Sequence, residues 1–197
     1  FRQSDDLEYF EILQQIRTGN ISHEGYEKLL SCCKKSIDEL EIKPTNLFPT
    51  KRQADEVNYR ELQKLNKDEP EITYKYKFHN DTNATLNKTL NTELTNQLKN
   101  SMCDEELVLK KGAQVMCISN IDQERNIVNG SQGIIIGFQT STDGTFQKFP
   151  VVKFDRLVSP EVIKPHTWLN ERNEKIGITQ IPLILSWAIT IHKSQGL

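Results

Sequence analysis

The length, composition and charge of this chain are those of an ordinary globular protein without a strong electrostatic bias. Its 197 residues, 36% of them hydrophobic and 26% charged, are enough to bury a core in one large domain or two small ones. The 25 Lys and Arg residues are balanced by 27 Asp and Glu residues, which excludes a global basic field as the basis for nucleic-acid binding. Any such binding has to come from local clusters.

The cysteines and the hydrophobic runs bear on two further classes of protein. The four cysteines form no CxxC pair and have no histidine at zinc-ligand spacing, so we expect no metal site and reduced, intracellular thiols. No apolar run approaches the roughly 20 residues of a membrane span, so we expect no membrane partner. Within the cell, the sequence favours none of three places of action over the others: the nucleus, the mitochondrion or a viral replication site. Because the sequence begins at Phe1 and stops at Leu197, directly after Gly196, we interpret it as a fragment of a longer polypeptide.

The first part of the chain predicts three helices and one short strand. Apolar residues at helical spacing predict a helix that is capped by Asp5 and stopped by Gly19, and a second helix from about Ser22. These two helices are too short to bury both faces alone, so we expect them to pack on a sheet. Residues 46–50 predict a short strand, and residues 51–65 a third helix.

The junction between that strand and the third helix is a first candidate binding site. Thr50 and Lys51 stand where a loop hydroxyl and the first N–H groups of a helix can meet a phosphate. The same pattern fits a solvated helix start in which Thr50 only caps the helix. The residues alone leave both interpretations open.

The middle of the chain changes from helical to strand-rich character. Residues 72–78 alternate apolar and polar side chains and predict a half-exposed strand. Residues 80–100 are rich in Asn and Thr and predict either a weak surface helix or a mobile connection, with a domain boundary near its end. From Leu107 onward, short strands separated by turn residues predict a small β-barrel.

Glycines in the strand-rich region predict turns and close contacts. Asn129-Gly130 and Asp143-Gly144 are the expected tight turns, and Gly133 marks a bend or a close backbone approach. The segment that contains Asn129 and Gly130 lies between strands and opens no helix. We therefore interpret it as a hairpin turn rather than a nucleotide-binding loop.

The last stretch of the chain is the main candidate site. The apolar run Ile181–Ile191 predicts one buried strand in a central position of a parallel sheet. Hydrogen-bond donors suited to phosphate oxygens cluster at its end: Thr190, His192, Lys193, Ser194 and Gln195. The alternative is an ordinary polar loop after a core strand. Together, the segments predict an α/β fold whose parallel-sheet part is interrupted by a small β domain.

Four segments of the sequence, taken together, point to a known family: FRQSDDLEYFEILQQIRTGNIS, LVLKKGAQVMCISNID, NIVNGSQGIIIGF and PLILSWAITIHKSQGL. In this order, they resemble the C-terminal half of the Pif/RecD-like superfamily-one DNA helicases. The resemblance implies a RecA-like parallel-sheet domain, incomplete here, in residues 1–100 and 179–197, with an SH3-like β-barrel inserted at residues 101–178. In that family, ATP hydrolysis drives movement along single-stranded DNA with 5′-to-3′ polarity.

The resemblance also implies roles for individual residues. Arg2 is placed as the catalytic arginine that reaches the ATP γ-phosphate. The implied ATP contacts are Arg2, Gln3, Gln195 and Gly196. The implied DNA contacts are Thr50, Lys51, Asn129, Gly130, Thr190, His192, Lys193 and Ser194. The expected partners are single-stranded DNA, the duplex fork, and the N-terminal RecA-like domain of the same polypeptide.

The motifs that hold the phosphates of ATP do not occur in this sequence. It contains no GxxxxGK[ST] loop, and we expect the Asp-Glu magnesium motif of the family in a domain outside this chain. We therefore expect ATP with Mg²⁺ to be held mainly by a domain outside this chain, and we expect the chain alone to be inactive as an ATPase. The competing hypothesis is a non-catalytic module of the same fold that binds nucleic acid or protein.

Overall fold

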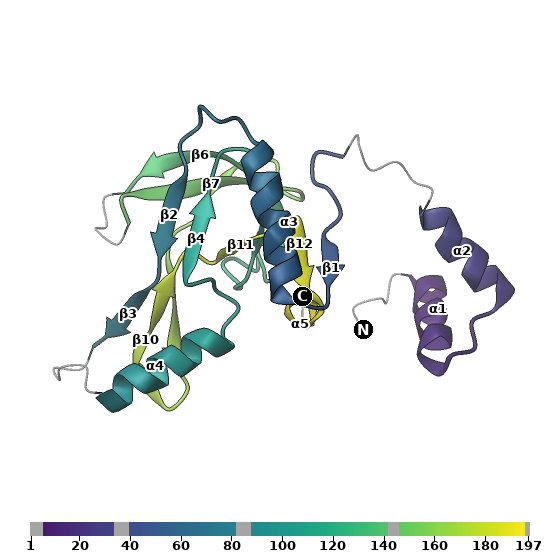
Figure 1. Ribbon diagram of the computed structural model, residues 1–197, viewed down its shortest axis with the longest axis horizontal. Helices are drawn as coiled ribbons and strands as arrows, with labels where there is room; N and C mark the ends of the chain where they lie inside the picture. The colour runs from purple at the N-terminus through teal and green to yellow at the C-terminus, as the bar shows by residue number, and fades with distance from the viewer. Residues whose placement is uncertain (1–5, 34–39, 82–87, 142–145, 196–197) are drawn as a thin grey trace. The chain divides into compact units, whose positions relative to one another are not determined.

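The computed structural model describes residues 6–33, 40–81, 88–141 and 146–195 (Figure 1). The chain divides into two compact units, residues 1–41 and residues 42–197.

The smaller unit consists of two helices, α1 (Leu7–Thr18) and α2 (His23–Cys33). The cap of α1 is Asp6, whose carboxylate accepts a hydrogen bond from the Tyr9 N–H at 2.9 Å. The prediction of Asp5 as the cap was therefore wrong by one residue. Gly19 ends α1 in the left-handed conformation, at φ 73°, as its position predicted.

The apolar faces of α1 and α2 are only partly covered within this unit. Ile12 is buried, whereas Tyr9, Ile16 and Tyr26 are 45%, 47% and 51% exposed. The expectation that both helices pack on a sheet stays a prediction.

The larger unit contains a small parallel α/β layer. Strand β1 (Asn46–Phe48) pairs in parallel with β12 (Ala188–Thr190), in a register that places Phe48 opposite Thr190. Helix α3 (Lys51–Lys64) follows β1 directly and covers this strand pair (Figure 1). The predicted strand at residues 46–50 and the predicted helix at residues 51–65 are both confirmed.

A buried asparagine joins α3 to β12. The Asn58 amide donates a hydrogen bond to the Ala188 carbonyl at 2.8 Å, and its Oδ1 accepts one from the Ala188 N–H at 2.9 Å. Asn58 thus satisfies the two backbone groups that a further strand would otherwise bind. The side chain fixes β12 against α3.

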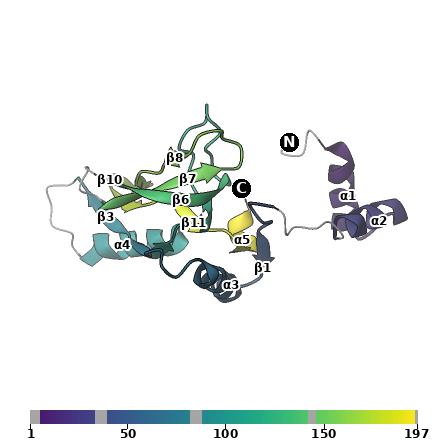
Figure 2. The same ribbon diagram turned by 90° about the horizontal axis from the view of Figure 1, so that it is seen from above.

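The rest of the larger unit is mainly antiparallel sheet. Figure 2 shows α3 and α4 (Lys88–Asn100) on one side of this unit and the hairpins of β6 to β8 on the other. A five-stranded sheet has the order β11 (Leu183–Leu185), β5 (Gln114–Cys117), β6 (Gln132–Thr140), β7 (Lys148–Phe154), β8 (Glu161–Val162). A three-stranded sheet has the order β3 (Lys77–Asn80), β10 (Asn173–Gln180), β9 (His166–Asn170), and β2 (Ile72–Lys75) pairs with β4 (Glu106–Leu109).

Two apolar clusters form the core of the larger unit. One lies in the five-stranded sheet and between β2 and β4, and includes Tyr74, Val115 and Ile135. The other lies beneath α4, whose Leu94 and Leu98 are buried there. The Asn- and Thr-rich segment therefore ends in a packed helix over residues 88–100, the first of its two predicted alternatives.

Two glycine predictions are confirmed by backbone geometry. A turn over residues 128–131 is closed by the Ser131 N–H and the Val128 carbonyl at 3.0 Å, with Gly130 at φ 95°. At Gly133 a Cβ atom would lie 2.6 Å from Val152 Cγ1. The Asp143-Gly144 turn lies outside the described residues.

The closing apolar run is not one strand, as predicted, but two. Strand β11 pairs with β5 in the antiparallel sheet, and β12 pairs with β1 in the parallel layer. The chain changes sheet at Ser186, whose N–H donates to the Gln114 carbonyl at 3.0 Å and whose carbonyl accepts from Thr45 Oγ1 at 2.8 Å. Hydrophobicity alone does not reveal such a change of partner, because both strands are buried.

Two further segments differ from the sequence predictions. The strand predicted over residues 72–78 is interrupted at Tyr76, and its halves β2 and β3 belong to different sheets. The segment after β12 is not an open loop but a helical turn, α5 (Ile191–Ser194). The division at residues 100/101 and 178/179 stays a prediction; strand pairing links β2 and β3 to strands beyond residue 101.

Candidate functional site

The parallel pairing of β1 and β12 brings the two predicted binding segments together. Both strands run in the same direction, so the residues that follow them lie at the same edge of the sheet. Thr50 and Lys51 follow β1, and His192 and Lys193 follow β12. We call this group, with Thr190 and Ser194, the strand-end site.

Both threonines of the strand-end site cap a helix. Thr50 Oγ1 accepts a hydrogen bond from the Gln53 N–H at 3.4 Å, and Thr190 Oγ1 accepts one from the Lys193 N–H at 3.2 Å. The capping role considered for Thr50 is therefore real, and it orients the first turn of α3. Thr190 is nearly buried, whereas Thr50 and His192 are exposed.

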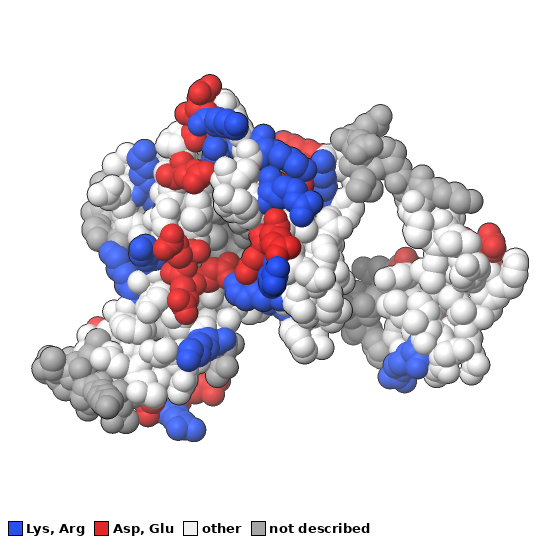
Figure 3. All heavy atoms as spheres, in the orientation of Figure 1, with Lys and Arg blue, Asp and Glu red and all other residues white. Residues whose placement is uncertain are grey.

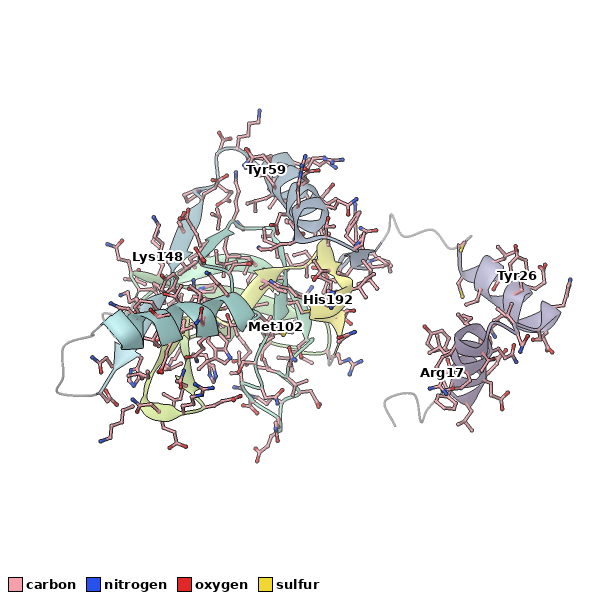
Figure 4. The ribbon with its side chains drawn as sticks, turned by 60° about the horizontal axis from the view of Figure 1, so that its bottom comes forward. Arg17, Tyr26, Tyr59, Met102, Lys148 and His192 are labelled. Carbon is pink, nitrogen blue, oxygen red and sulfur yellow. The ribbon has the colours of Figure 1, made fainter. Side chains whose placement is uncertain are left out.

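The two lysines of the strand-end site share one carboxylate. Asp104 Oδ1 lies 3.3 Å from Lys51 Nζ and 3.4 Å from Lys193 Nζ. Lys193 Nζ also donates to the Met102 carbonyl at 3.0 Å. Figure 4 labels Met102, just beyond α4, and His192 on α5. The segment between α4 and β4 thus forms the third wall of the site.

The charges of the site nearly cancel. Lys51 Nζ has a second carboxylate, Asp55 Oδ2, at 3.3 Å. Partial burial lowers the pKa of Lys51, but the charges of Asp104 and Asp55 outweigh that effect and leave its pKa above the ordinary value. Figure 3 shows the same balance on one face of the larger unit, where basic and acidic side chains alternate.

A small cavity adjoins these charged groups. Its volume is about 20 Å³, and Lys51, Asn58, Asp104 and Lys193 are among the residues that line it. A volume of this size holds about one water molecule. The cavity beside the strand-end site is therefore too small to hold a ligand much larger than water.

The remaining polar residues at the end of β12 have different surroundings. Ser194 Oγ donates to the Ile191 carbonyl at 2.7 Å. The exposed Gln195 ends α5, where its N–H donates to the His192 carbonyl at 3.2 Å. Arg2, Gln3 and Gly196 lie outside the described residues.

Asn129 and Gly130 are held apart from this group by other contacts. The Asn129 N–H donates to Asn120 Oδ1 at 3.0 Å, and the Gly130 N–H donates to the Cys117 carbonyl at 2.9 Å. Among the described residues, neither Asn129 nor Gly130 forms a hydrogen bond or an ion pair with the strand-end site. Their predicted role in DNA binding would belong to a second surface.

Three residues that support the strand-end site were not predicted from the sequence. Asp104 and Asp55 hold its lysines, and Asn58 fixes β12. Only Asn58 could have been found from the sequence, because it is a polar residue among the apolar residues on the inner face of a predicted amphipathic helix. Asp104 lies 53 residues from Lys51 in sequence and carries no local signal.

The described residues contain neither a candidate metal-binding cluster nor a helix that could span a membrane. No group of three His, Cys, Asp or Glu side chains within them could hold a metal ion. None of the helices formed by them is long and apolar enough to cross a membrane.

Comparisons with known proteins agree with this architecture. The family model "DNA helicase Pif1, 2B domain" matches residues 93–138. The ATP-dependent DNA helicase PIF1 of Xenopus laevis is 34% identical over 200 residues, which cover 100% of this chain and 28% of that protein. The Pif1 helicase of Candida albicans matches with a TM-score of 0.69 at 30% identity, over 100% of this chain and 47% of that one.

A solved complex extends the comparison. The Bacteroides Pif1 helicase with ADP-AlF3 and ssDNA matches with a TM-score of 0.55 at 25% identity, over 100% of this chain and 42% of that one. The relatives named here are DNA helicases, and the present chain spans 28% of the Xenopus relative. This chain is therefore similar, over its whole length, to the C-terminal region of Pif1-like helicases, which confirms the resemblance drawn from its sequence.

Proposed function

We propose that this chain is the C-terminal part of an ATP-dependent DNA helicase that moves 5′-to-3′ on single-stranded DNA and unwinds duplex. The observation that carries the proposal is that Lys51 and Lys193, which follow two parallel strands, lie close enough together to contact the same carboxylate. The likeness to Pif1 helicases over the whole chain supports it.

The strand-end site would grip the DNA backbone. Ammonium groups, hydroxyls and backbone N–H groups bind phosphate oxygens without distinguishing bases. We assign this role to Thr50, Lys51, Thr190, His192, Lys193 and Ser194. Because such binding releases counterions from the DNA, its affinity should fall steeply with salt and depend little on base sequence.

We also propose which domains this fold contains and where their boundaries lie. The parallel layer of β1, β12 and α3 supports a RecA-like domain, and the antiparallel sheets support an SH3-like insert. The proposed boundaries are residues 1–100, 101–178 and 179–197. In this scheme Asn129 and Gly130, in the turn before β6, contact DNA at the fork.

ATP would be held mainly by the N-terminal RecA-like domain of the same polypeptide. The described residues lack both a phosphate-binding Gly-rich loop and a carboxylate cluster for Mg²⁺. From this chain, Arg2, Gln3, Gln195 and Gly196 would complete the nucleotide site, and ATP would supply the free energy for movement. The isolated chain would show no ATPase activity. We propose an intracellular site of action for the whole protein.

Unwinding by the longer polypeptide tests the proposal. A duplex with a 5′ single-stranded tail should be unwound in the presence of ATP and Mg²⁺, and a duplex with only a 3′ tail should not. Arg2→Ala should abolish ATP turnover and spare DNA binding, whereas Arg17→Ala, an exposed arginine on α1 (Figure 4), should change neither. DNA binding without unwinding would favour the non-catalytic module.

A further inference from the structure

We propose that the Asp104 carboxylate competes internally with DNA: it binds Lys51 and Lys193 when DNA is absent and is exchanged for a backbone phosphate when DNA binds. The inference rests on the proposed function. It assigns a role to a residue that neither the sequence motifs nor the family resemblance singled out.

The geometry of the carboxylate carries the inference. A single oxygen, Asp104 Oδ1, lies 3.3 Å from Lys51 Nζ and 3.4 Å from Lys193 Nζ. A phosphate oxygen held by both ammonium groups would take the same position. Asp104 therefore occupies the place at which the two strand ends would jointly bind DNA.

Electrostatics makes simultaneous binding of carboxylate and phosphate unfavourable. With Asp104 in place, the two lysines face two carboxylates, Asp104 and Asp55, so the group has no net positive charge. Like charges a few ångströms apart repel strongly at a partly buried site. Asp104, whose side chain is 28% exposed, is the more enclosed of the two acids.

The contacts around Asp104 allow the exchange to be local. Gln180, which is fully buried, donates to the backbone carbonyl of Asp104 at 3.2 Å and to that of Tyr74 at 3.1 Å. Lys193 keeps its bond to the Met102 carbonyl at 3.0 Å. The backbone and Lys193 thus stay in place while the Asp104 side chain rotates toward solvent.

An internal competitor also weakens the grip of the site on DNA. When a phosphate dissociates, Asp104 returns to the two lysines. This return lowers the free energy that is needed to release the DNA backbone. Such a site suits a protein that has to bind and release the backbone repeatedly.

Fluorescence anisotropy of the 197-residue chain with a labelled oligo(dT) tests the inference. Asp104→Asn should bind about tenfold more tightly at low salt, and the gain should shrink as salt screens the removed repulsion. Glu106→Gln is the matched control, because it removes the same charge from a nearby carboxylate that is bonded to Lys75 at 3.3 Å. The control should change affinity less than about twofold.

The same assay separates this inference from the proposed function. Lys51→Ala and Lys193→Ala should each weaken binding, and the gain from Asp104→Asn should vanish when both lysines are replaced. If the lysine variants bind like the wild type, the proposed DNA grip fails. If they bind weakly but Asp104→Asn gives no gain, or Glu106→Gln gives an equal gain, only the exchange is overturned. Asp104→Ser, with its fold checked by circular dichroism, repeats the test in case the Asn variant misfolds.

Discussion

Replacing Asn58 by alanine should destabilise the larger unit through β12. The substitution removes two buried hydrogen bonds, from the Asn58 amide to the Ala188 carbonyl at 2.8 Å and from the Ala188 N–H to Asn58 Oδ1 at 2.9 Å. It leaves a buried N–H and a buried carbonyl without their partner. Each unsatisfied group costs about 1–3 kcal/mol, so for the two groups we expect a loss of about 2–6 kcal/mol in the free energy of unfolding.

Urea denaturation followed by circular dichroism measures this loss. Tyr59→Ala is the matched control, since Tyr59 is the next residue of α3, is 66% exposed and is labelled in Figure 4. It should cost less than about 0.5 kcal/mol. If Asn58→Ala costs no more than Tyr59→Ala, then Asn58 does not hold β12, and the explanation for the position of Thr190 and Lys193 is wrong.

Three further predictions concern packing, thiol reactivity and titration. Gly133→Ala should cost about 1–3 kcal/mol in urea denaturation, because the added Cβ meets Val152 Cγ1 at 2.6 Å; Gly137→Ala, which meets no atom within 4 Å, is the control and should change stability far less. Burial raises the pKa of the Cys103 and Cys117 thiols, so mass spectrometry after iodoacetamide at neutral pH should find the exposed Cys32 and Cys33 modified first, and equal rates at all four would contradict the burial. Hydrogen bonds from Arg125 lower the pKa of Asp122. This carboxylate therefore stabilises the fold at pH values above its unfolded-state pKa, and the contribution disappears as pH falls through the lower folded-state pKa. In an NMR titration, Arg125→Gln should return the pKa of Asp122 toward its ordinary value, and an unchanged pKa would refute the assigned cause.

Local patterns predicted the parallel part of the site well. Spacing and capping residues located the strand at residues 46–48, the helix that follows it, and the turn at Gly130. They also selected Lys51 and Lys193, which the structure places at one sheet edge. These features depend on backbone propensities within a few residues, so they are visible in the sequence.

Features that depend on distant partners were not predictable in this way. The closing apolar run divides between two sheets because Gln114, about 70 residues earlier, binds the backbone at Ser186. The carboxylate of Asp104 lies near the two lysines in a segment that the pairing of β2 with β4 and a hydrogen bond from Gln180 hold in place. A single sequence contains no record of such pairings.

NMR mapping of oligo(dT) on the 197-residue chain tests the central claim most directly. The account predicts that the largest amide shift changes fall on residues 50–53 and 190–195, at the ends of β1 and β12, and that they disappear in the Lys51→Ala, Lys193→Ala double variant. Shift changes confined to other surfaces, with these two segments unchanged at saturating DNA, would contradict it.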